Sequence, residues 1–202
     1  MLIQAIDTAS KVVAFTFDDG PNPVYTPQLL EIFAEAGGKA TFYMIGEQIA
    51  AHPEVAKLVH EQGHEIGNHT YTHPNMTELP DEEIESELAR TEELIKKITG
   101  SRAATMRLPY LAGDERVHAI LARNGYPSIG ALNMDAKDWD MPGVDHILDS
   151  SRKEVRNGSI LIFHDGYGDR SQSVEAIRVL TQELTASGYR LVTVRELLQM
   201  AK

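Results

Sequence analysis

Two adjacent carboxylates, Asp18 and Asp19, stand at the end of an apolar run in the stretch FTFDDGPNP. Like charges this close repel each other unless a cation lies nearby. Two histidines further along the chain, His69 and His73 in HTYTH, offer such a cation two imidazoles. One carboxylate and two neutral imidazoles leave a divalent ion with open positions for water and substrate. This ligand set is typical of a catalytic metal site rather than a structural one.

The H-x-x-x-H spacing predicts two imidazoles on one side of a helical turn, close enough to share one ion. Alone, this spacing more often belongs to solvated loop histidines, and it is the carboxylates that favour a metal site. Because neighbouring residues usually point apart, one aspartate can be the ligand and the other a general base that activates water. Arg107, in RLPY, is the cation available to keep that base ionised.

A third imidazole, His164, ends the apolar run ILIF in the stretch LIFHDG. In isolation, a structural core histidine fits this position equally well. Beside the metal, pairing with an aspartate would raise the pKa of His164 and keep it protonated as a proton donor. Asp135 and Asp138, in DAKDW, follow another predicted strand. A base on one side of a carbonyl and an acid on the other is the arrangement that amide or ester hydrolysis needs.

Strand ends must bring these groups together. Short β-branched or aromatic runs cover residues 11–17, 40–45, 65–68, 104–107, 128–132, 159–163 and 190–194. Amphipathic segments cover residues 26–36, 53–62, 80–99, 114–124, 144–156, 172–187 and 195–200. Seven such alternations, with strands that are apolar on both faces, predict an α/β fold with a parallel sheet inside helices. No glycine-rich phosphate fingerprint follows any strand. We therefore favour a distorted (β/α) barrel of about seven parallel strands over an open doubly wound sheet, with the polar groups at one rim.

The chain has 202 residues, of which 42% are hydrophobic and 24% charged, so we expect a single globular domain, 1–202. The formal net charge of −11 argues against nucleic acid or an anionic membrane as a partner. There are no cysteines, which excludes disulfides and thiolate chemistry. No apolar stretch is long enough to insert into a membrane, and residues 1–13 lack a signal-peptide pattern. The expected location is cytoplasmic, or extracellular or in the cell wall if the sequence is a trimmed domain.

From about residue 11 to residue 198, the sequence resembles the polysaccharide deacetylases of carbohydrate esterase family 4. TFDDGP, HTYTH, RLPY, DAKDW and LIFHD match the five motifs of this family in order. Each motif is modest alone, whereas five in order, each behind a predicted strand, make a specific signal. The resemblance implies one catalytic domain with a distorted (β/α) barrel. It also implies metal-dependent removal of N- or O-acetyl groups from sugars.

The resemblance also implies a role for each motif residue. The implied catalytic residues are the base Asp18, the acid His164, Arg107 orienting the base, Asp135 tuning the acid, and Tyr110, whose backbone N–H helps hold the oxyanion. The implied metal ligands are Asp19, His69 and His73. The implied lining of the acetyl-methyl pocket is Leu161 and Trp139. The cofactor is expected to be one divalent ion, zinc, with cobalt or nickel as substitutes.

Leu111 stands where many members of the family have glycine, next to the implied oxyanion donor, so substrate preference stays open. The expected partner is an acetylated glycan containing N-acetylglucosamine, such as a chitin oligosaccharide or peptidoglycan, and the protein is expected to be a monomer. The alternatives are an acetylxylan esterase and an amidase or deformylase for small molecules. A carbohydrate-binding protein without catalysis is disfavoured, because the base, the acid and three metal ligands are all present.

Overall fold

The computed structural model describes residues 2–201 of the chain. Its centre is a parallel sheet with the strand order β3-β2-β1-β4, to which β5 adds by pairing with β1. The strands are β1 (Val12–Asp18), β2 (Thr41–Met44), β3 (Glu65–Asn68), β4 (Ser159–His164) and β5 (Arg190–Leu191). Every residue of β1, β2 and β3 is buried. This burial explains their unbroken apolar runs, because helices cover both faces of the sheet.

Two of the seven predicted strands are reduced to isolated bridges. Met106 bridges to Asn68 on one side and to Ser128 on the other, and Ile129 bridges to Ile3. The prediction of about seven strands is therefore corrected to five strands and a bridged segment. Prolines at positions 109 and 127 flank these short runs, and a proline cannot donate to a strand ladder.

The N-terminal segment completes the path around the sheet. It bridges to Ile129 through Ile3 and, in antiparallel fashion, to Ser159 of β4 through Ala5. The path from β3 through Met106 and residues 128–129 to residues 3–5 and β4 outlines a distorted barrel. No continuous strand ladder closes this barrel among the described residues.

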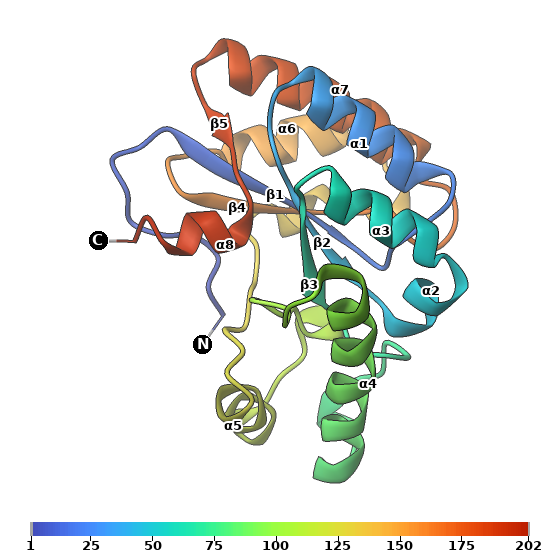
Figure 1. Cartoon of the computed structure of the whole chain (residues 1–202). Helices are drawn as coiled ribbons and strands as arrows, with labels where there is room; N and C mark the ends of the chain where they lie inside the picture. The colour runs from blue at the N-terminus through green and yellow to red at the C-terminus, as the bar shows by residue number, and fades with distance from the viewer. Residues whose placement is uncertain (1, 202) are drawn as a thin grey trace.

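Helices surround the sheet (Figure 1). They are α1 (Tyr25–Glu35), α2 (Gly46–Ala51), α3 (Pro53–Glu61), α4 (Asp81–Thr99), α5 (Glu115–Arg123), α6 (Val144–Glu154), α7 (Ser171–Ala186) and α8 (Val194–Leu198). Short 3₁₀ turns cover Met76–Glu78, Pro109–Leu111, Met134–Ala136 and Asp138–Asp140. All seven predicted helices match the structure within two residues at each end. The sequence analysis missed α2, which spans too few residues to show a helical period. Within residues 2–201, no helix is both long and apolar enough to cross a bilayer.

The core fixes where β1 and β4 end. All five phenylalanines of the chain are fully buried, and their neighbouring ring centroids lie 5.0–6.2 Å apart. Phe15 and Phe17 of β1 pack on Phe163 of β4 and on Phe33 of α1. This cluster holds the two strands in one register, so that their last residues come out side by side.

Candidate active site

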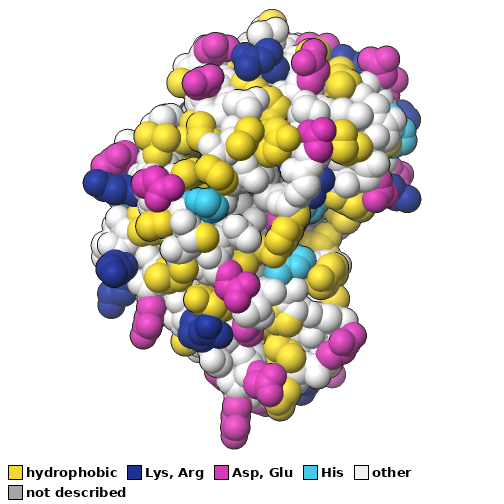
Figure 2. All heavy atoms as spheres, turned by 90° about the vertical axis from the view of Figure 1, so that its right-hand side faces the viewer, with side chains coloured by type: hydrophobic (Ala, Val, Ile, Leu, Met, Phe, Trp, Pro, Cys, Tyr) yellow, Lys and Arg dark blue, Asp and Glu magenta, His cyan; other side chains and the backbone are white. Residues whose placement is uncertain are grey.

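Three strand ends bring the predicted polar groups to one rim. Asp18, the last residue of β1, lies opposite His164, the last residue of β4, in the strand ladder. His69 follows β3 directly, and its N–H donates to the carbonyl of Met44 at the end of β2. A cavity of about 580 Å³ opens here, and Asp18, His69 and His164 are among its lining residues. Figure 2 shows a hollow on this side of the molecule, bordered by hydrophobic and histidine side chains.

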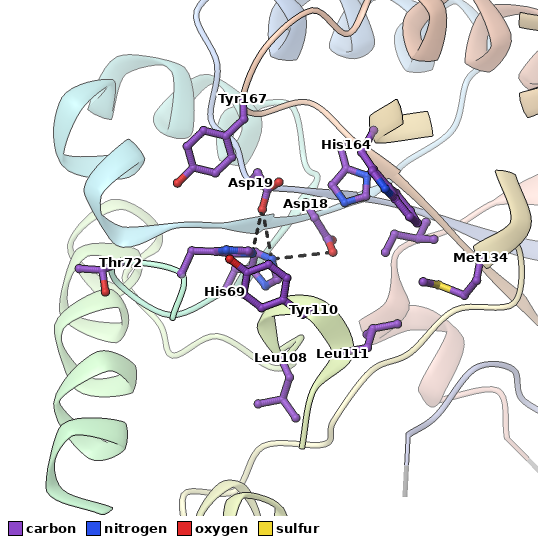
Figure 3. A pocket seen from close by; sticks show the side chains of 13 residues that line it. Asp18, Asp19, His69, Thr72, Leu108, Tyr110, Leu111, Met134, His164 and Tyr167 are labelled. Carbon is purple, nitrogen blue, oxygen red and sulfur yellow. Dashed lines mark ion pairs between the residues drawn. The ribbon is translucent and has the colours of Figure 1, made fainter. Parts of the chain in front are cut away.

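The two adjacent aspartates point to different partners. Asp18 still belongs to the extended strand, whereas Asp19 has a φ of 75°, in the left-handed region. Gly166 permits this turn, because a Cβ at position 166 would lie 2.0 Å from the carbonyl oxygen of Asp19. The Asp19 carboxylate therefore faces the imidazoles, and that of Asp18 points toward His69 (Figure 3). Asp18 also forms an ion pair with Arg107.

Asp19, His69 and His73 form a cluster that fits one metal ion. Their three ligand atoms all lie within 4.8 Å of one another. Oδ1 of Asp19 is 3.4 Å from Nε2 of His69 and 3.2 Å from Nε2 of His73, and it is buried with no hydrogen-bond partner among residues 2–201. Burial opposes ionisation of Asp19, but the imidazoles of His69, His164 and His73 outweigh it and lower the pKa of this carboxyl to about 2. One carboxylate and two imidazoles suit a divalent ion such as zinc.

The imidazole of His69 is held in the tautomer that a metal needs. Its Nδ1–H donates to the backbone carbonyl of Arg107 at 2.7 Å, which leaves the lone pair of Nε2 free toward Asp19. The predicted helical turn between the two histidines is wrong. Thr70 and His73 have φ values of 66° and 60°, so the imidazoles converge through an irregular loop.

Arg107 lies where the sequence predicts it, against Asp18. Its side chain is fully buried, and Nη1 donates to Oδ1 of Asp18 at 2.7 Å and to Oγ1 of Thr16 at 2.6 Å. Its remaining N–H groups reach the carbonyls of Ile129 and Gly130, at 3.2 and 2.9 Å. A guanidinium fixed at four points can hold the Asp18 carboxylate in one orientation.

The partner of His164 is Asp138 and not Asp135. Oδ1 of Asp138 lies 2.8 Å from Nδ1 of His164, and its Oδ2 accepts the His164 backbone N–H at 2.8 Å and the Ser173 hydroxyl at 2.7 Å. Burial lowers the pKa of His164, but the Asp138 carboxylate outweighs burial and raises it to about 9. Asp135 is exposed and its carbonyl contacts His146, because the left-handed Lys137 (φ 42°) reverses the chain between the two aspartates.

The prediction that Leu161 lines the site is also wrong. Leu161 is fully buried in the core, whereas Ile162 lines the cavity beside Trp139. Side chains alternate along a strand, so Ile162, two residues before His164, shares its side of β4, and Leu161 faces the other way. Trp139 packs edge-on against His164, with ring centroids 5.3 Å apart.

Further cavity residues come from loops. Tyr110 lines the cavity with a φ of 58° and 70% of its surface exposed, and its ring lies 4.7 Å from that of His73. Leu111 and Met134 add apolar side chains, and Tyr167 stands above Asp19 in Figure 3. Of these residues, Tyr110 is the last residue of the RLPY motif and Leu111 follows it directly, whereas Met134 and Tyr167 lie outside the five motifs.

One buried residue behind the site has no role in the sequence prediction. Asp165 accepts a hydrogen bond from the Thr26 hydroxyl, and its backbone N–H donates to the carbonyl of Asp18 at 3.1 Å. Burial raises the pKa of Asp165 to about 7. Asp165 thus ties the segment after β4 to the end of β1 and to the first turn of α1, and it is not among the residues that line the cavity.

The cluster of Asp19, His69 and His73, called the triad below, lies at the carboxyl ends of the parallel strands. The oriented carboxylate of Asp18 and the protonated imidazole of His164 flank it. This fold and site define a metal-dependent hydrolase of the α/β class. The polysaccharide deacetylase family model matches residues 5–129. The chain is 37% identical to a peptidoglycan-N-acetylglucosamine deacetylase of Bacillus cereus over 190 residues, covering 94% of this chain and 89% of that protein. It is 32% identical to a chitooligosaccharide deacetylase of Bradyrhizobium sp. over 196 residues, covering 91% and 89%.

Solved structures agree with this match. The crystal structure of the Bc1960 peptidoglycan N-acetylglucosamine deacetylase, in complex with an N-hydroxybenzamide compound, superposes with a TM-score of 0.92 at 28% identity. It covers 98% of this chain and 93% of that chain. The chain belongs to the polysaccharide deacetylase family.

Proposed function

We propose that this protein hydrolyses N-acetyl groups on glycans that contain N-acetylglucosamine, releasing acetate, with one zinc ion held by Asp19, His69 and His73. The observation that carries the proposal is the single cavity that contains this triad together with Asp18 and His164. Relatives named for peptidoglycan and for chitooligosaccharides support the substrate class. We further propose that the catalytic unit is one domain that acts as a monomer.

The proposed mechanism assigns one task to each side chain. When bound, the divalent ion supplies Lewis-acid chemistry and makes water a stronger acid. Asp18, held by Arg107, takes the proton of the attacking water. His164, protonated and paired with Asp138, gives a proton to the sugar nitrogen as it leaves. The acid and the base come from adjacent strands in register, so they face the same reacting group.

The surroundings of the reacting carbonyl are assigned to loop residues. The backbone N–H of Tyr110, a residue that lines the cavity with a left-handed φ of 58°, would meet the developing oxyanion. Such a donor contributes roughly 2.7–4 kcal/mol to transition-state stabilisation. Trp139 and Ile162 would enclose the methyl group, in place of the Trp139–Leu161 pair that the resemblance implies. Both side chains lie on the same side of the site as His164, the group that protonates the departing nitrogen.

Acetate release from a substrate panel tests the proposal. The panel contains chitin oligosaccharides, peptidoglycan, acetylated xylan and acetylated polyamines, each with metal-free protein and with added zinc, cobalt or nickel. Zinc-dependent acetate release from the first two, and little from the others, is the expected result. Acetate release from acetylated xylan or acetylated polyamines alone would show that the proposed substrate class is wrong. Glycan binding without any acetate release would show that the protein is not a deacetylase.

The pH dependence of turnover should have an alkaline limb set by His164. Because the acid must be protonated and the pKa of His164 is raised to about 9, kcat should fall as the pH rises through about 9. In Asp138→Asn the carboxylate that contributes most to raising this pKa is gone, while burial and the smaller effects of Asp18 and Asp19 remain. The alkaline limb should therefore move to lower pH by roughly 1–3 pH units, as expected for the loss of a contacting opposite charge.

Asp135→Asn is the matched control for this measurement. It removes a carboxylate from the same motif but from an exposed position, so its pH profile should coincide with that of the wild-type protein. If the alkaline limb of the pH profile moved in Asp135→Asn and stayed in place in Asp138→Asn, Asp135 rather than Asp138 would be the partner of His164. Zinc content is measured in both variants to separate the proton donor from the metal site.

A further inference from the structure

The loop that joins the two histidine ligands has an unusual backbone. Thr70 and His73 both adopt left-handed conformations, which residues with a Cβ rarely take up. Through these turns, Nε2 of His73 arrives 3.2 Å from Oδ1 of Asp19. Such conformations persist only where the surroundings fix them. The metal site therefore depends on whatever fixes this loop.

One side chain outside the loop holds its middle. Oε2 of Glu87 accepts the backbone N–H groups of Tyr71 and of Thr72, each at 2.7 Å. Oε1 of Glu87 accepts the hydroxyl of Thr72 at 3.0 Å. The N–H groups at positions 70 and 73 donate to side chains within residues 68–70. Of the four backbone N–H groups at positions 70–73, only those of Tyr71 and Thr72 donate to another element of the described chain, and both donate to Glu87.

Glu87 is presented by a rigid support. It lies on α4, whose apolar face, including Ile84, Leu88 and Ile95, is buried in the core. Glu87 is 8% exposed as a residue, and the guanidinium of Arg90 lies 4.0 Å from Oε1 of its carboxylate. A buried carboxylate is costly unless it is hydrogen-bonded, and here the hydrogen bonds are with the loop between the ligands.

We propose that Glu87 is a positioning residue of the metal centre. It fixes residues 70–73 so that His69 and His73 present Nε2 to the same ion. Glu87 lies 14 residues after His73 and outside all five motifs. This inference rests on the proposed function, because it takes the ion to bind at Asp19, His69 and His73.

The test measures metal binding rather than turnover. Metal-free wild-type protein, Glu87→Ala and Glu87→Gln are titrated with zinc against a chromophoric chelator, and with cobalt to record its visible absorption bands. Glu87→Ala should weaken zinc binding at least about tenfold, as expected when a group that orients metal ligands is lost. Its cobalt bands should change in position or intensity. Glu87→Gln keeps a carbonyl oxygen for the two N–H groups and should recover most of the affinity.

Glu92→Ala is the matched control on the same helix. Glu92 accepts the backbone N–H of Ala103 at 3.1 Å and the hydroxyl of Tyr126, so it also clamps a loop, but not the loop between the histidines. It should lower thermal stability while keeping the wild-type zinc affinity and cobalt spectrum. If Glu87→Ala does not fold, Glu87→Asp, whose shorter side chain cannot span both N–H groups, is held to the same tenfold criterion.

Wild-type zinc affinity and cobalt bands in the Glu87 variants would overturn the inference and leave the proposed function intact. A weakening of equal size in Glu92→Ala would also overturn it, because the effect would then follow from general loss of stability. A wild-type protein that binds neither ion would overturn the proposed function together with this inference.

Discussion

Replacing Asp18 with asparagine is expected to abolish most glycan deacetylation while zinc stays bound. Asparagine keeps an oxygen for the Nη1 donor of Arg107 but cannot take a proton from water at neutral pH. Loss of a general base costs about 10²–10⁴-fold in rate. The measurement is kcat on a chitin oligosaccharide, with the zinc content of the same preparation determined in parallel.

The outcome separates two roles for Asp18. The proposed ligand is Asp19, whose Oδ1 lies 3.4 Å from Nε2 of His69, against 3.8 Å for Oδ2 of Asp18. Stoichiometric zinc with a large loss of kcat supports Asp18 as the base. Loss of zinc in Asp18→Asn would instead make Asp18 a ligand, and turnover within a few-fold of the wild-type rate would refute the base assignment.

Replacing His69 with alanine should remove the metal and, with it, the activity. The substitution deletes one of the three proposed ligands and leaves the carbonyl of Arg107 without its donor. A metal acting as a Lewis acid stabilises the transition state by several kcal/mol, so kcat/KM should fall at least about 10³-fold. Thermal unfolding provides a second readout. At a hundredfold excess over Kd, zinc should stabilise the wild-type protein by about 2.7 kcal/mol and leave His69→Ala unchanged.

His60→Ala is the control for this comparison. His60 is an exposed histidine on α3 outside the cavity lining, so the zinc-dependent stabilisation should match that of the wild-type protein. A His69→Ala protein that retains zinc at one equivalent would refute the assigned ligand set. Equal losses of stabilisation in the two variants would point to zinc binding elsewhere on the surface.

The fold could be predicted largely from hydrophobic patterning. Long amphipathic segments show a helical period, and buried parallel strands are apolar on both faces, so both were readable in the sequence. The segments around Met106 and Ser128 look like strands because they are equally apolar, but the flanking prolines limit them to bridges. Residues 3–5, which bridge to Ile129 and Ser159, have no sequence signature, because these bridges form only when distant parts of the chain meet in the folded structure.

The site, too, could be predicted only in part from the sequence. The residues that follow strands directly could be predicted, because parallel strands deliver their carboxyl ends to one rim. Choosing Asp138 over Asp135 required the backbone path through two 3₁₀ turns and a left-handed Lys137, which residue spacing does not encode. Ile162 could have been found from strand alternation, since it lies two residues before His164. Glu87 could not, because its contacts with the histidine loop exist only after α4 has packed.

The segment around Ile3 is connected to Asp18, the proposed base, through a short series of hydrogen bonds. Ile3 exchanges backbone hydrogen bonds with Ser128 and Gly130, at 3.0 and 2.9 Å, and the carbonyls of Ile129 and Gly130 restrain the Arg107 guanidinium. Substitutions that break the pairing of Ile3 would therefore be expected to loosen the guanidinium that orients Asp18, and so to lower the rate of proton abstraction as well as stability.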